Sequence, residues 1–331
     1  MHSDHFSVHA EQFSDVDEQA STLAGWEQEY QQLGSGRFVG ALAIVETDEF
    51  CFIRESTNTA LHERIVPPPE QMVIGICNTQ AQGHLLNGRP LTQDQLIVLD
   101  GSRPHHIRTT GPIELLGISV PRELFLSQLH EQDEASVRKW LDLSVLQLDA
   151  ATAGMLRHYF SVAFDLLNTP AGAAARPISP RALASTAISN VALALSLNQG
   201  SHELESTLPS RQRRERIVQN AIDYMRAHAG EEIGILDVCR ATHVSRRTLQ
   251  YCFEERLDIS PLQYLKALRL NAAHREIKRR GSEDRVHDRH DTIGNLAALC
   301  GFNHPSRFAS EYKKMFGVLP SETALKTAAQ S

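Results

Sequence analysis

The sequence predicts an α+β protein of two domains, in which a β-rich N-terminal domain with flanking helices precedes an all-α C-terminal domain. Three observations support this. The chain has 331 residues, more than one average domain needs. Short β-favouring runs fill residues 38 to about 120, and helical periodicity follows from about 121. From Arg211 onward, 21 Lys and Arg face 15 Asp and Glu, whereas the rest has 12 against 25.

The β-rich part shows five runs that are typical of strands, namely "FVGALAIVE", "FCFIRES", "MVIGICN", "QLIVLD" and "IELLGISV". Asn87-Gly88 lies between "GHLL" and "RPLT", which predicts a hairpin with a type I′ turn. Gly111-Pro112 marks another turn. Many short strands at such spacing predict a small barrel or a double-sheet jelly roll.

The helical pattern begins with "PRELFLSQLHEQ", which places Pro121 at a suitable first helical position. "TAGMLRHYFSVAFDLLN" and "PRALASTAISNVALALSLN" continue it. The stretch "VALALSL" is apolar on most sides, so we expect the helices within 152–199 to pair two chains. The polar stretch 198–212 lacks periodicity and predicts a linker. The predicted divisions are 1–125 (β-rich), 126–200 (dimerising helices), 201–212 (linker) and 213–331 (helical).

The last region contains an internal repeat. "ILDVCRATHVSRRTLQYCF" and "IGNLAALCGFNHPSRFASEY" start 58 residues apart, at Ile235 and Ile293. Each has an apolar helix, a short turn and a second helix led by a polar capping residue. This is the pattern of a helix-turn-helix unit, present twice, at about 233–257 and 291–317.

Both repeats have a plausible inner face and turn. In the first, Ser245 is expected to cap the second helix, and Leu249 and Phe253 to face inward. In the second, Gly301 supplies the turn and Asn303 the cap. Its inner stripe is predicted to be Phe308, Tyr312 and Phe316, and Gly317 ends the helix.

The outward faces are the candidate DNA-binding surface. An outward polar face is by itself more often just solvated, but two in matching positions favour DNA contact. Arg and Gln near the start of a second helix can pair with guanine and adenine edges in the major groove. The candidates are Arg246, Arg247, Gln250 and Tyr251 in the first repeat, and His304, Ser306, Arg307, Ser310, Lys313 and Lys314 in the second.

Their expected roles differ. Arg246, Arg247 and Gln250, with Ser306, Arg307 and Ser310, are the predicted base readers, whereas His304, Lys313 and Lys314 are predicted to touch phosphates. The helix from about Pro261 to Arg280 would be roughly 30 Å long. That length would hold the two repeats over adjacent major-groove segments.

The sequence here resembles the AraC/XylS family of bacterial transcription regulators. "IGNLAALCGFNHPSRFASEYKKMFGVLPSE" is similar to that family's signature across its second helix-turn-helix. "VSRRTLQYCFEERLDISPLQYLKALRLNAAHREI" resembles the first recognition helix and the central linker helix. The resemblance covers about 211–326. Pro305 in the first turn of the second recognition helix departs from the pattern, as do Ser310 and Glu311, which stand where many members carry Arg.

The resemblance implies more than the residues show. It implies a cupin-like N-terminal domain for effector sensing, then helices that form a homodimer. It implies double-stranded DNA as the partner, a small-molecule effector if there is one, and RNA polymerase if the protein is an activator. Activation and repression stay open alternatives. No cofactor is expected.

The rival hypothesis is a metal-binding cupin enzyme, because His84, His105 and His106 lie in the β-rich region, with His62 and Glu63 upstream. Adjacent residues on a strand point to opposite faces, so His105 and His106 cannot both face inward without a bulge. No HxH pair with a suitably spaced carboxylate is visible. Neither a Ser-His-Asp order nor a phosphate-binding glycine loop appears, so we expect no enzyme and no metal. An effector-independent protein-interaction role for this domain also stays open.

The composition favours a cytoplasmic protein. The first twenty residues contain no apolar segment of a secretory signal, and no apolar run approaches the length of a membrane span. Five cysteines without a CxxC pair are most simply reduced thiols.

Overall fold

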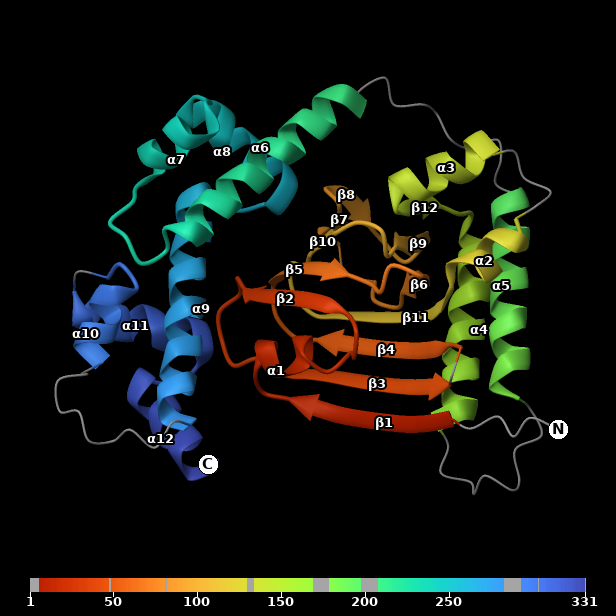
Figure 1. Cartoon of the computed structure of the whole chain (residues 1–331), viewed down its shortest axis with the longest axis horizontal. Coiled ribbons are helices and arrows are strands. Elements are labelled where there is room, and N and C mark those ends of the chain that lie inside the picture. The colour runs from red at the N-terminus through yellow and green to blue at the C-terminus, as the bar shows by residue number, and fades with distance from the viewer. Residues whose placement is uncertain are drawn as a thin grey trace. The chain divides into compact units, whose positions relative to one another are not determined.

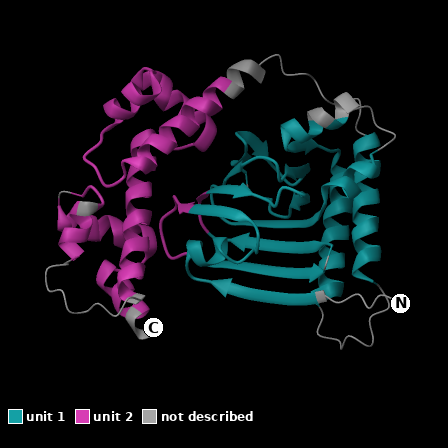
Figure 2. Cartoon of the chain, viewed as in Figure 1, with its two compact units in different colours: residues 1–30, 39–58, 63–204 teal, residues 31–38, 59–62, 205–331 magenta. Residues whose placement is uncertain are grey.

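A computed structural model describes residues 6–47, 49–80, 82–129, 134–168, 179–197, 208–282, 293–302 and 304–330. The chain forms two compact units, shown in Figure 2. The N-terminal unit comprises residues 1–30, 39–58 and 63–204. The C-terminal unit comprises residues 205–331 together with two short early segments, 31–38 and 59–62.

The N-terminal unit contains a seven-stranded antiparallel sheet in the order β1-β3-β4-β11-β6-β9-β12 (Figure 1). The strands are β1 (Phe6–Phe13), β3 (Gly40–Thr47), β4 (Cys51–Thr57), β11 (Ile113–Pro121), β6 (Gln71–Cys77), β9 (Gln95–Asp100) and β12 (Val145–Gln147).

A second sheet has the order β2-β5-β10-β7-β8. Its strands are β2 (Glu27–Gln32), β5 (Leu61–Val66), β10 (His105–Arg108), β7 (His84–Leu86) and β8 (Arg89–Leu91). The domain is thus built from two separate antiparallel sheets, the double-sheet alternative of the two that the sequence offered. The hairpin between β7 and β8 turns at Asn87 (φ 50°) and Gly88 (φ 69°), as a type I′ turn requires.

Helices complete this unit: α1 (Val16–Ala20), α2 (Arg122–Ser127), α3 (Glu134–Leu143), α4 (Ala150–Asn168) and α5 (Pro180–Leu197). Helix α4 packs on the seven-stranded sheet and α5 lies beside α4 (Figure 1). Every second residue of β4 and β6 faces these helices. Phe52, Ile74 and Ile76 join Phe160 and Phe164 in one buried core.

The sequence located the apolar strands of this unit and missed the polar ones. β1, β2, β5 and β10 carry charged, amide or imidazole side chains among their apolar ones, so they show no clean apolar alternation. Helix α2 begins at Arg122, because Pro121 still belongs to β11 and serves as the N-cap.

The C-terminal unit holds seven helices in its described residues: α6 (Leu208–Ala227), α7 (Ile235–Thr242), α8 (Arg246–Leu257), α9 (Pro261–Ser282), α10 (Ile293–Leu299), α11 (Pro305–Phe316) and α12 (Pro320–Gln330). Helix α6 starts inside the predicted linker. The remainder of that linker, 201–207, and most of the long loop before α10 lie outside the described residues. No helix in the described part of the chain is long and apolar enough to cross a membrane.

Two hydrophobic cores of this unit share helix α9. Tyr264, Leu265 and Leu268 pack with α6, α7 and α8. Ala267, Leu270, Ala273 and Ile277 pack with α10 and α11. One helix therefore fixes the two helix-turn-helix units relative to each other.

The early segment 31–38 is bonded into the same unit. The buried side chain of Asn271, on α9, accepts from the backbone N–H of Gln32 at 3.1 Å and donates to its carbonyl at 2.9 Å. The side-chain amide of Gln32 in turn donates to the backbone carbonyl of Met315 at 2.6 Å. Leu33 packs against both cores. His62, from the segment 59–62, forms a hydrogen bond between its Nδ1 and the Tyr264 hydroxyl at 2.8 Å.

Candidate nucleic-acid interface

The first helix-turn-helix unit is α7 and α8. His243 takes a left-handed conformation in the turn (φ 54°), one of the few residue types that tolerate it. The hydroxyl oxygen of Ser245 accepts from the backbone N–H of Thr248 at 3.1 Å, so Ser245 is the N-cap that the sequence predicted. Leu249, Cys252 and Phe253 form its buried face. This packing leaves the opposite face of α8 to solvent.

The outward face of α8 carries the predicted residues. Arg246 and Arg247 are exposed in the first turn. Gln250 is half-buried and its amide donates to the Glu254 carboxylate at 2.5 Å, a bond that it must exchange to reach a base. Tyr251 is 55% exposed, with the guanidinium of Arg214 6.0 Å from its ring centroid. Sequence reasoning missed this role of Arg214, which comes from α6.

The second unit is α10 and α11. Gly301 turns the chain at φ 77°. Phe308, Tyr312, Met315 and Phe316 are the buried face of α11, which includes the predicted stripe. Gly317 ends the helix in a left-handed conformation. The positive-φ residue lies eight positions after the first helix start in both units, at His243 after Ile235 and at Gly301 after Ile293.

The cap of α11 differs from the expectation. Pro305 occupies the first helical position, so the N-cap is His304, whose side chain makes no capping hydrogen bond. The predicted cap, Asn303, lies outside the described residues. An X-Pro step holds the preceding residue extended, which is why the helix begins one residue later than predicted.

All six candidates on the second unit are exposed: His304, Ser306, Arg307, Ser310, Lys313 and Lys314. Glu311 lies among them but is half-buried and bonded to Lys266 of α9 at 2.9 Å. That hydrogen bond lowers the pKa of Glu311, so its carboxylate stays charged and paired. Its charge is therefore partly neutralised on a surface that is otherwise basic.

The spacing of the two units follows from α9. Its 22 residues span about 33 Å at 1.5 Å per residue. Successive major-groove segments on one side of B-DNA lie about 34 Å apart. The geometry therefore allows one chain to present α8 and α11 to adjacent groove segments.

The histidines of the rival metal hypothesis have other contacts. His105 is buried and contacts the Asp100 carbonyl at 3.0 Å through Nε2, and burial lowers its pKa to about 4. His84 is buried, and its Nδ1 accepts from the backbone N–H of Thr110. His62 contacts Tyr264. Over the described ranges, no three His, Cys, Asp or Glu residues are placed to hold a metal ion.

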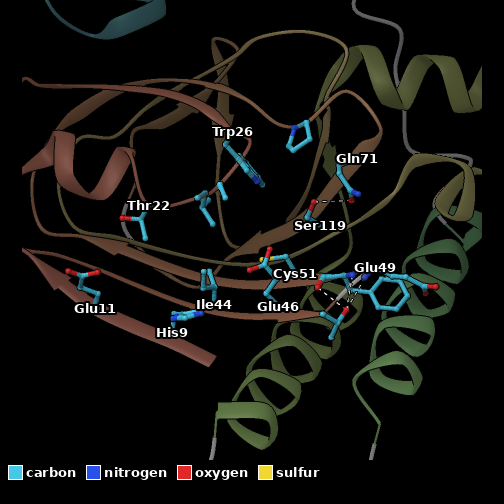
Figure 3. A pocket seen from close by; sticks show the side chains of 15 residues that line it. His9, Glu11, Thr22, Trp26, Ile44, Glu46, Glu49, Cys51, Gln71 and Ser119 are labelled. Atoms are coloured by element: carbon cyan, nitrogen blue, oxygen red, sulfur yellow. Dashed lines mark hydrogen bonds between the residues drawn. The ribbon is translucent and has the colours of Figure 1, made fainter. Parts of the chain in front are cut away.

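An open cavity of about 370 Å³ lies in the N-terminal unit (Figure 3). Trp26 faces Cys51 and Glu46 across it, and Ser119 donates to Gln71 at one side. Burial, with the charge of Glu46, raises the pKa of Cys51 to about 12, so this thiol is a poor nucleophile. The cavity has room for a small molecule.

Comparisons with known proteins agree with this geometry. A helix-turn-helix domain family profile matches residues 238–326. A probable thc operon regulatory protein of Rhodococcus erythropolis is 32% identical over 158 residues, which is 47% of this chain and 44% of that protein. The transcriptional activator RhaR of Pectobacterium carotovorum is 37% identical over 83 residues, 25% of this chain and 26% of that one. The chain thus matches less than half the length of these curated relatives.

Solved structures give similar matches. An AraC-type regulator from Chromobacterium violaceum is 26% identical, with a TM-score of 0.31, covering 35% of this chain and 96% of that one. The AraC-like activator CuxR is 15% identical, with a TM-score of 0.42, covering 82% and 96%.

Two helix-turn-helix units on one shared helix define a DNA-binding domain of the double helix-turn-helix class. Residues 238–326 match the helix-turn-helix domain family, and the curated relatives that match this chain are described as transcriptional regulators. The C-terminal domain is of AraC type, as the resemblance of the sequence to the AraC/XylS family implied.

Proposed function

We propose that this protein is a cytoplasmic regulator of transcription that binds a specific DNA sequence, with one chain contacting two adjacent major-groove segments. The observation that supports this best is the shared helix α9, which sets two exposed, basic recognition faces at about the groove spacing. The relatives described as regulators and activators support the same class. We infer no enzymatic activity.

We assign base contacts to Arg246, Arg247 and Gln250 of α8 and to Ser306, Arg307 and Ser310 of α11. Arg247 is the main reader, because it is exposed in the first helical turn and can bond guanine with two N–H groups. His304, Lys313 and Lys314 contact phosphates. Tyr251 is a further DNA-binding candidate of the first unit. The second unit has fewer groups that discriminate between bases.

The test is DNA binding by Arg247→Ala and Arg307→Ala, on the preferred site and on scrambled DNA. Arg247→Ala is expected to cost about 1–3 kcal/mol on the preferred site and to relax preference at one base pair. Arg307→Ala should show a smaller loss of the same kind. Equal losses of Arg247→Ala on both DNAs would show that Arg247 contacts only the backbone.

The N-terminal unit is proposed to sense a small-molecule effector and to form a homodimer through α4 and α5. Five large apolar side chains of these helices are exposed: Met155, Val162, Leu166, Leu193 and Leu197. A buried interface would remove them from water. If the protein activates transcription, RNA polymerase is the further partner.

A further inference from the structure

Four polar side chains lie buried between the two sheets of the N-terminal unit. They are Gln19 of α1, Tyr30 of β2, Glu55 of β4 and Glu63 of β5, here called the carboxyl cluster, with exposed fractions of 1%, 0%, 9% and 2%. Glu55 Oε1 accepts from both the Tyr30 hydroxyl and the Gln19 amide at 2.7 Å. Glu63 interacts electrostatically with Glu55 and Tyr30.

The cluster has more acceptors than donors. Gln19 is oriented by its bond to Glu55, and its own Oε1 is buried with no hydrogen-bond partner. Glu63 is 2% exposed, and the charge of Glu55 acts on its carboxyl group. Burial acts on both carboxyl groups, with the Tyr30 and Gln19 hydrogen bonds acting on Glu55 and the charge of Glu55 acting on Glu63.

Such a site is costly to the fold. Each buried carboxylate loses its hydration, and the loss is recovered only through a paired charge and hydrogen bonds. Burial accordingly raises the pKa of both Glu55 and Glu63. Uncompensated buried acids of this kind concentrate at functional sites.

The open cavity lies over the same face of the sheet as Glu55, and its lining residues are neighbours of the cluster rather than members of it. Side chains alternate along a strand, so Cys51 and Glu55 of β4 point to one side, into the space between the sheets. Cys51 lines the cavity of Figure 3. At about 3.3 Å per residue, Glu55 lies some 13 Å further along that face.

We propose that the carboxyl cluster binds the positively charged head group of a small organic cation, a primary ammonium or guanidinium, with Glu63 as its main partner. Such a head group carries several N–H donors and a positive charge, the two things that Gln19 Oε1 and the two carboxyl groups lack. The inference deepens the proposed sensing role, because it gives the effector a chemical class.

Two of the chain segments that carry the cluster lead directly into the DNA-binding unit. Glu63 follows His62, which is bonded to Tyr264, and Tyr30 stands two residues before Gln32, which is bonded to Asn271. A ligand that bonds Glu63 acts on strands β2 and β5 immediately before these contacts. Its occupancy can therefore be transmitted along the backbone.

The test is a thermal-shift and calorimetric titration of the full chain with n-butylammonium chloride and with methylguanidinium chloride. n-Butanol and matched NaCl are the controls. We expect saturable stabilisation by one cation at least, and none by the controls. Glu63→Gln, which keeps the shape but cannot form the carboxylate that a bound cation stabilises, should weaken binding at least about tenfold. Glu123→Gln, an exposed carboxylate of α2, should bind as the parent does.

Several results would overturn the proposal: no saturable effect of either cation, equal stabilisation by n-butanol, or unchanged binding in Glu63→Gln. A crystal structure with cation present that shows only water in the cluster would do so too. DNA binding is measured on the same samples without cation. Its loss would contradict the proposed regulatory function, whereas its retention beside a failed titration would contradict the ligand class alone.

Discussion

Glu63 shows how a single residue can oppose the stability of its own fold. Its carboxyl group is 2% exposed, and burial followed by the nearby Glu55 raises its pKa well above the ordinary value. The folded state therefore holds a proton that the unfolded state releases. Stability falls as pH rises through the range between the unfolded pKa, about 4.3, and the raised folded pKa.

We therefore expect Glu63→Gln to stabilise the protein at neutral pH, by on the order of 1 kcal/mol or more. The gain should shrink as pH falls towards the unfolded pKa, because the parent carboxyl group is then neutral in both states. Melting temperatures of parent and variant between pH 4 and 8 measure this. A constant difference across that range would mean that Glu63 is ionised in the folded state.

Lys313 is proposed to contribute charge to DNA binding without base recognition. It is exposed in the last turn of α11, away from the helix start that is proposed to enter the groove. Lys313→Ala should weaken binding to all DNA sequences alike and lower the salt slope, log K against log salt, by about one unit. Fluorescence anisotropy over a salt series measures it. A loss confined to the preferred site would assign Lys313 to base contact instead.

At the scale of elements, the turns of the two helix-turn-helix units adopt the same left-handed backbone conformation with different residues. Gly301 and His243 both have positive φ, 77° and 54°. A Cβ at Gly301 would come within 2.7 Å of Arg269 Nε, and Arg269 is itself held by the carbonyls of Ala229, Glu231 and Ile233. The Arg269 side chain therefore cannot move away without losing those bonds.

Substitutions at the two turn residues are expected to have opposite effects on the free energy of unfolding. Gly301→Ala should destabilise by about 1–2 kcal/mol, through backbone strain and the Arg269 contact. His243→Gly should be neutral or stabilising by up to about 1 kcal/mol, because glycine adopts this conformation without a Cβ penalty. Urea unfolding of the two variants checks the pair. Destabilisation by His243→Gly of similar size would show that the His243 side chain makes an essential contact.

The elements also show how much of the structure could be predicted from the sequence. The apolar strands, the Asn87-Gly88 hairpin and both helix-turn-helix units follow from periodicity and turn chemistry, which are local. β5 was missed because "LHERIV" places His62 and Glu63 where an apolar pattern is expected. His62 contacts Tyr264, which is distant in the chain, and Glu63 is buried near the like charge of Glu55. The exposed faces of α8 and α11 were predictable, but the pairing of Gln250 with Glu254 and of Glu311 with Lys266 was not.

At the scale of the whole molecule, the exposed apolar residues of α5 predict self-association. Leu193 and Leu197 are 54% and 72% exposed on a helix that otherwise packs beside α4. We expect the parent chain to be a dimer at micromolar concentration and Leu193→Glu/Leu197→Glu to be a monomer. Leu325→Glu, equally exposed on α12, is the matched control and should stay dimeric. A monomeric parent in light scattering would contradict the prediction.

The DNA-binding unit is not contiguous in sequence, because residues 31–38 and 59–62 are part of it. Asn271 holds the first of these segments by bonding both the N–H and the carbonyl of Gln32, and Ala267 accepts a further bond from its amide. Asn271→Ala leaves two buried backbone groups without partners, at about 1–3 kcal/mol.

The bond to Asn271 protects the backbone N–H of Gln32 from hydrogen exchange. Exchange of this N–H in the full chain should therefore accelerate about ten- to a hundredfold in Asn271→Ala. The neighbouring Leu33 amide, bonded to the Ala60 carbonyl, should follow if the segment leaves as one piece. The Tyr264 amide, bonded to Ser260 at the start of α9, serves as the internal reference and should not change. Unchanged protection at Gln32 would mean that the segment is held by Leu33 and the Gln32–Met315 bond. Packing rather than Asn271 would then hold the segment 31–38 in this unit.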